Sequence, residues 1–140
     1  MEPHRIVFLN QSFTRLAPTA RSAASLFYGR LMEMDPTTRP LFAATDMAGQ
    51  GAKLMEALAM AIAALEQPGA LVPKLREMAL RHVGYGVQRE HYASVGAALI
   101  WTLREALGEH FTPAVEDAWA EAYAVLADVM MDAAYRVRAA

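Results

Sequence analysis

The chain has 140 residues, no cysteine and a formal net charge of −2, and 55% of its residues are hydrophobic. This hydrophobic content excludes a disordered chain, and the lack of cysteine excludes disulfides, thiolate zinc sites and thiol nucleophiles. Acidic and basic residues are interspersed, so no basic patch indicates a nucleic-acid partner.

In the first half of the chain, apolar residues recur at helical spacing. This spacing predicts helices over residues 4–16, 19–34 and 50–66. Asp35 and Pro36 are typical of a helix cap followed by a first-turn proline, and they predict a short helical turn toward Phe42. A loop is expected over 43–49, and Pro68-Gly69 should end the third helix.

The second half predicts three further helices. One should begin with Pro73 in its first turn and end before Gly84 and Gly86. Another is expected over 89–107, stopped by Gly108, and the last should begin at Thr112-Pro113 by a cap-plus-proline device. The chain is therefore expected to be all-α, with six or seven helices joined by short turns.

Nothing in these helices indicates a membrane or secreted protein. The longest apolar run, over 57–65, is far shorter than the roughly 20 residues that span a bilayer. The first residues lack the apolar segment of a secretory signal. We expect one domain over residues 1–140, located in the cytoplasm, with no membrane span.

His82 falls on the apolar side of its helix, in the last turn. Taken alone, such a residue is more often a core histidine with one hydrogen bond than a ligand. Gln50 and Leu54 lie one turn apart on the preceding long helix and therefore look the same way. Together these two helices would form a slot with a ligating side and an opposing side. By itself, Tyr28 is expected to be a core aromatic and Gln50 an exposed first-turn residue.

Three segments carry a resemblance to a known family: LFYGRLMEMDPTTRPLF, LVPKLREMALRHVGYGVQREHYASVG and FTPAVEDAWAEAYAVLADVMM. With Tyr28, Phe42, Gln50 and His82 in this order, the chain resembles the globins. It is most similar to the bacterial single-domain globins and to the globin portion of flavohaemoglobins. The resemblance implies the three-over-three globin fold around a haem pocket.

Carried over to this chain, the resemblance implies that His82 is the proximal ligand of the haem iron. Tyr28 and Gln50 would be the distal, catalytic pair, and Leu54 would form the apolar wall over the iron. A one-turn shift in register would put Leu54 in place of Gln50. The remaining cofactor contacts implied are Phe42 against the porphyrin, Met78, Val87, Tyr92 and Val95 on the proximal side, and Lys53 or Arg81 near the propionates.

The resemblance also implies a function. Haem b would be the cofactor, and dioxygen would bind tightly and leave slowly, with NO and CO as further gas ligands. The expected activity is dioxygenation of NO to nitrate. Flavohaemoglobins use an attached reductase, so a chain of 140 residues is expected to need an external one. As an assembly we expect a monomer or a weak homodimer.

Two other functions stay open: a haem-based gas sensor, or an oxygen store or redox partner without turnover. A helical domain that has lost haem is a third reading. The family often braces the proximal histidine with a tyrosine and a glutamate. Tyr92 matches the tyrosine, but the glutamate position falls near Ala133, where only Asp132 is acidic, so a peroxidase-like role is not expected. His4, His91 and His110 are assigned to the surface.

Overall fold

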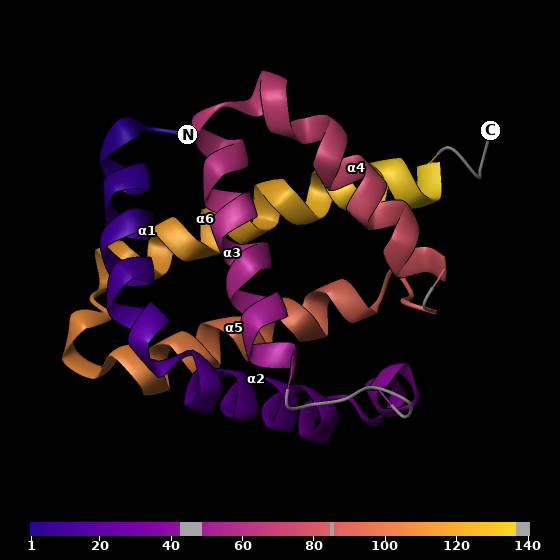
Figure 1. Cartoon of the computed structure of the whole chain (residues 1–140), viewed down its shortest axis with the longest axis horizontal. Coiled ribbons are helices and arrows are strands. Elements are labelled where there is room, and N and C mark those ends of the chain that lie inside the picture. Colours follow the sequence, from indigo (N-terminus) through magenta and orange to yellow (C-terminus); the bar gives the residue numbers. More distant parts are fainter. Residues whose placement is uncertain (43–48, 85, 137–140) are drawn as a thin grey trace.

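The computed structural model describes residues 1–42, 49–84 and 86–136, and within these ranges the chain is built from helices without strands (Figure 1). The α-helices are α1 (Pro3–Leu16), α2 (Ala20–Met34), α3 (Gln50–Glu66), α4 (Pro68–Gly84), α5 (His91–Leu107) and α6 (Pro113–Met131). Shorter helical turns are η1 (Ala17–Thr19), η2 (Pro36–Phe42), η4 (Gly108–His110) and η5 (Asp132–Arg136). No helix in the described ranges is both long and apolar enough to cross a membrane. The all-α prediction is confirmed.

Local sequence signals explain most helix ends. The Thr112 hydroxyl accepts a hydrogen bond from the Val115 N–H at 3.3 Å, and Pro113 takes the first position of α6. Gly108 ends α5 with a φ of 55°, in the left-handed region that favours glycine. Both ends were predicted. The predicted loop over 43–49 lies outside the described residues except for Gly49.

One predicted boundary is wrong. The helix that carries His82 begins at Pro68, and Pro73 lies inside it. Pro68 satisfies the same first-turn condition as Pro73, because its missing N–H has no partner to lose there. Gln67 alone separates α3 from α4. The helix therefore has 17 residues instead of the dozen expected.

The helices cross one another around a shared core. In Figure 1, α1 and α3 run steeply across α6 and α5, and α2 runs along α5 on the side away from α6. The principal contacts join α2 with α5, α3 with α2 and α4, and α6 with α1 and α4. Through these contacts α3, which holds Gln50, touches both α2, which holds Tyr28, and α4, which holds His82.

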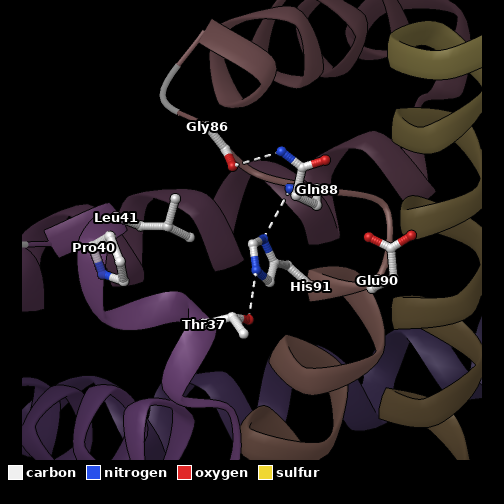
Figure 2. A pocket seen from close by; sticks show the side chains of 7 residues that line it. All are labelled: Thr37, Pro40, Leu41, Gly86, Gln88, Glu90 and His91. Carbon is white, nitrogen blue, oxygen red and sulfur yellow. Dashed lines mark hydrogen bonds between the residues drawn. The ribbon is translucent and has the colours of Figure 1, made fainter.

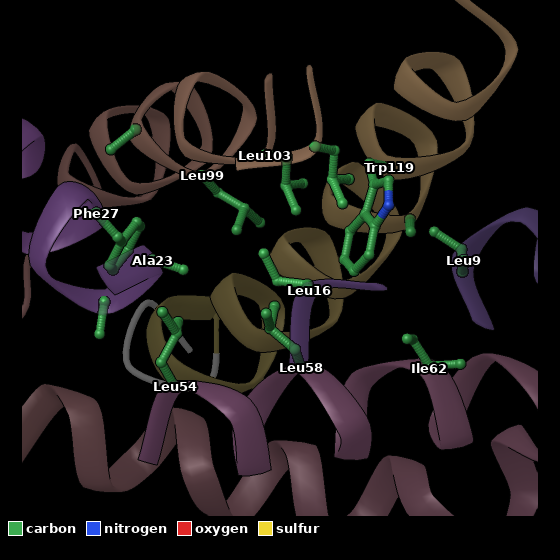
Figure 3. Packing of buried hydrophobic residues seen from close by; sticks show 14 of the residues in the cluster. Leu9, Leu16, Ala23, Phe27, Leu54, Leu58, Ile62, Leu99, Leu103 and Trp119 are labelled. Atoms are coloured by element: carbon green, nitrogen blue, oxygen red, sulfur yellow. The ribbon is translucent and has the colours of Figure 1, made fainter. Parts of the chain in front are cut away.

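Apolar side chains from α1, α2, α3, α5 and α6 fill the centre (Figure 3). One face of α2 is buried throughout: Ala24, Phe27, Tyr28 and Leu31. Burial of each large apolar side chain contributes roughly 1.5–3 kcal/mol. Trp119 adds a buried hydrogen bond, from its indole Nε1 to Ser12 Oγ at 2.8 Å. This bond ties α6 to α1 across 107 residues of sequence.

Candidate functional site

Tyr28 of α2 and Gln50 of α3 meet in the interior. The Tyr28 hydroxyl donates to Gln50 Oε1 at 3.2 Å, and the two side chains are 9% and 8% exposed. The position of Gln50 in a first helical turn, taken by itself, indicated an exposed side chain, and the structure shows a buried one, as the distal position implied by the resemblance requires. The amide of Gln50 lies against the tyrosine of another helix, and a local sequence pattern does not indicate such a contact between helices. Two polar groups buried together in this way satisfy each other in apolar surroundings.

Aromatic and aliphatic side chains surround this pair. The centroid of the Phe42 ring lies 5.2 Å from that of the Tyr28 ring, at an interplanar angle of 68°. The centroid of the Phe27 ring, also on α2, lies 4.9 Å from that of Tyr28. Leu54, one turn after Gln50, is buried in the same cluster. Burial raises the pKa of Tyr28 above its ordinary value, so the phenol stays protonated and remains a hydrogen-bond donor at neutral pH.

His82 is half-buried near the end of α4, and its orientation is fixed. Its Nδ1 lies 2.7 Å from the backbone oxygen of Met78, one turn earlier. A carbonyl oxygen only accepts, so Nδ1 carries a hydrogen, and in the neutral ring Nε2 then carries the lone pair. A neutral imidazole held by its other nitrogen in this way is the form that ligates metals.

Three tyrosines lie beside the bend that follows α4, which is the segment that holds Gly86, Val87 and Gln88. Tyr135 Oη donates to the Val87 carbonyl at 2.9 Å, and its ring stands perpendicular to that of Tyr92 at 6.4 Å. Tyr123 Oη donates to the Tyr92 carbonyl at 2.6 Å. The Tyr92 hydroxyl is buried without a hydrogen-bond partner in the described part of the chain, and burial raises its pKa to about 12. No described carboxylate accepts its hydrogen.

The other predicted contacts are spread around these groups. Val95 is half-buried against the core, while Lys53 and Arg81 are exposed on α3 and α4. Of the predicted set, the structure joins Tyr28 with Gln50 and Phe42, and His82 with Met78, by direct contacts. The roles of these residues remain predictions.

The family model described as Globin matches residues 25–130, which is most of the chain. The chain belongs to the globin family. This match covers every predicted site residue, and it confirms the resemblance on which the site was predicted.

Relatives and a solved structure agree with this assignment. The Flavohemoprotein of Bordetella parapertussis is 40% identical over 109 residues, which are 75% of this globin and 27% of that protein. The Flavohemoprotein of Xylella fastidiosa is 33% identical over 134 residues, covering 93% and 33%. This globin thus spans about a quarter to a third of the relatives' length. A bacterial globin from Campylobacter jejuni matches 99% of this chain and 100% of its own, with a TM-score of 0.85 at 23% identity, so the globin fold is confirmed.

Membership in this family implies a haem cofactor and the binding of diatomic gases. The residues present fit such a group. Among the described residues, no cluster of three or more His, Asp or Glu could hold a bare metal ion. Haem brings its own nitrogen ligands and needs one axial ligand from the protein, for which His82 has the required tautomer.

A hollow of about 570 Å³ lies between η2 and the bend after α4 (Figure 2). Leu41 of η2 lines one wall, and Gly86 and Gln88 of the bend line the other. Leu41 precedes Phe42, and Gly86 and Gln88 flank Val87. The hollow therefore lies between two segments that were predicted to contact haem.

His91 also lines this hollow, and its assignment to the surface is wrong. It is only 5% exposed, whereas His4 and His110 are exposed as predicted. The sequence signal was weak: a histidine at the first position of α5, directly after a bend. Its burial results from the bend folding back onto η2, a contact between segments 54 residues apart.

Proposed function

We propose that this globin binds haem b through His82 and holds dioxygen tightly on the side of Tyr28 and Gln50. We further propose that it works as one domain over residues 1–140 in the cytoplasm and converts NO to nitrate with an electron from a separate reductase. The buried Tyr28–Gln50 hydrogen bond is the observation that carries this proposal. Burying two polar side chains costs desolvation free energy that two apolar side chains in the same place would not cost. A role toward a bound ligand gives a reason for polar side chains at these positions.

When bound, haem supplies a redox-active iron at which NO, dioxygen and one electron give nitrate. The protein's part is to hold, orient and shield. His82 binds through Nε2 while the Met78 carbonyl fixes its ring. Phe42, Leu54 and Phe27 exclude water around the polar pair, which strengthens each hydrogen bond made there.

Tyr28 and Gln50 can offer donors in two arrangements. As the amide stands, Tyr28 donates to Oε1, which leaves both Nε2 hydrogens of Gln50 for another acceptor. A half-turn of the amide lets Nε2 donate to the Tyr28 oxygen, which releases the phenol hydrogen toward a ligand. Each hydrogen bond to a charged partner contributes about 1.5–3 kcal/mol. Two such bonds would slow ligand dissociation by roughly 150-fold or more.

The first test is the dioxygen dissociation rate of the reconstituted protein. We expect Tyr28→Phe to release dioxygen about 10- to 150-fold faster, because it loses one hydrogen bond of this strength. Thr102→Val is the matched control, since it removes a buried hydroxyl that donates to the Ala98 carbonyl within α5. A Tyr28→Phe rate equal to that of Thr102→Val would contradict the distal role.

The second test is turnover. The oxygenated protein should consume NO and produce nitrate, and a supplied flavin reductase should sustain the cycle. Tight dioxygen binding without NO consumption would contradict the catalytic proposal and favour a sensor or an oxygen store.

A further inference from the structure

A continuous chain of hydrogen bonds runs through His91. The Gln88 backbone N–H donates to His91 Nδ1 at 2.8 Å, so Nε2 carries the hydrogen (Figure 2). Nε2 donates to Thr37 Oγ1 at 3.1 Å, and the Thr37 hydroxyl donates to Asp35 Oδ1. Ser94 Oγ donates to the other oxygen of that carboxylate at 2.7 Å. All donors in this chain point toward Asp35.

This chain of hydrogen bonds connects the two segments that line the hollow. Thr37 belongs to η2, which ends at Phe42, and Gln88 belongs to the bend that follows His82 and contains Val87. Gly86 and Leu41 mark a second place where the same segments approach each other closely. A Cβ built on Gly86, whose φ is 97°, would lie 3.4 Å from Leu41 Cδ2. The hydrogen bond from His91 Nε2 to Thr37 therefore joins η2 to the bend where the two segments lie close together.

We propose that His91 is a positioning residue that sets the spacing between Phe42 and the His82–Val87 segment, and so holds the haem in place. This inference rests on the proposed haem site. It predicts that the bond across the hollow, from His91 Nε2 to Thr37, is the functional one. The bond to Gln88 joins neighbours in sequence and only shapes the start of α5.

Two substitutions separate the two bonds. In His91→Gln, the side-chain amide reaches the place of Nε2 and can still donate to Thr37, but the acceptor for Gln88 is lost. In His91→Asn, the side-chain oxygen lies near the place of Nδ1 and can still accept from Gln88, but the bond to Thr37 is lost. Thr37→Val removes the same cross-hollow bond from the other side.

The measurement is the rate of haem transfer from the ferric holoprotein to an excess of an apoglobin acceptor. We expect His91→Asn and Thr37→Val to lose haem about three- to tenfold faster than the wild type, and His91→Gln to stay within about twofold. Proton NMR of the CO form gives a second readout, because the haem ring current shifts the Phe42 ring resonances. Those resonances should move in His91→Asn and Thr37→Val and be restored in His91→Gln.

Ser12→Ala is the stability control. It leaves the buried Trp119 indole without its acceptor, away from the hydrogen-bond chain. The unfolding free energy of each apoprotein is measured beside its haem-loss rate. The proposal would be overturned if the haem-loss rate rises with the loss of unfolding free energy in the same proportion in Ser12→Ala and in His91→Asn. So would a His91→Gln variant as impaired as His91→Asn. A wild type that takes up no haem would instead overturn the proposed function, and this inference with it.

Discussion

At the scale of single residues, the Tyr92 hydroxyl is an unusual feature of this globin. It is buried, its pKa is raised to about 12 by burial and by the neighbouring Tyr135, and no described group accepts its hydrogen. A buried donor without an acceptor loses its hydration and gains no bond in return. The hydroxyl therefore lowers the stability of the fold.

Removing this hydroxyl should stabilise the apoprotein. We expect Tyr92→Phe to raise the free energy of unfolding in urea by about 1 kcal/mol. Tyr123→Phe should have the opposite effect. The Tyr123 hydroxyl donates to the Tyr92 carbonyl at 2.6 Å, so its removal should lower the free energy of unfolding by about 1 kcal/mol. Equal destabilisation by the two variants would mean that Tyr92 has an acceptor after all.

The same tyrosines predict a loss of stability at alkaline pH. Burial raises the pKa of Tyr92 to about 12, and it also raises the pKa of Tyr123, from an ordinary value of 10.0. Above pH 10 the unfolded chain therefore binds fewer protons than the folded one, and the unfolding free energy falls as pH rises. This contribution is complete below pH 10 and is lost as pH rises through 12. The limiting slope is about 1.4 kcal/mol per pH unit for each group.

Urea titrations between pH 9 and pH 11.5 measure this slope. The wild type should lose stability across that range, and Tyr92→Phe should lose it less steeply. A slope unchanged by the substitution would contradict the assignment of the raised pKa to Tyr92.

At the scale of elements, α5 and α6 approach closely because Gly96 has no side chain. A Cβ at this position would lie 2.6 Å from Cε2 of the Tyr123 ring. Gly96→Ala should therefore displace that ring, break its bond to the Tyr92 carbonyl and lower the unfolding free energy by about 1–3 kcal/mol. The control is Gly29→Ala on α2, where a Cβ meets nothing within 4 Å and alanine should add about 1 kcal/mol. A Gly96→Ala variant as stable as Gly29→Ala would contradict this packing.

The helices could be predicted from sequence because their signals are local. Pro113 at the start of α6 and Gly108 after α5 each act within one turn. The start of α4 was missed because Pro68 and Pro73 both suit a first turn, and local spacing cannot choose between them. Burial at the site was harder to predict. Gln50 and His91 are buried by contacts with Tyr28 and Thr37, which lie 22 and 54 residues away.

At the scale of the whole molecule, the globin fold assembles a site from segments that are far apart in sequence. Tyr28 and Gln50 come from α2 and α3, Phe42 from η2 and His82 from α4. The tyrosine–glutamine pair and the oriented imidazole thereby belong to different helices. Haem ligated by His82 would join these helices through a single group, so haem binding would depend on that one ligand.

The most direct test is the visible absorption spectrum of the haem-reconstituted protein, compared between the wild type and His82→Ala. His110→Ala, which removes an exposed histidine, is the control. We expect a five- or six-coordinate haem spectrum in the wild type and in His110→Ala, lost in His82→Ala and recovered with added imidazole. An unchanged spectrum in His82→Ala, or a wild type without stoichiometric haem, would contradict this expectation.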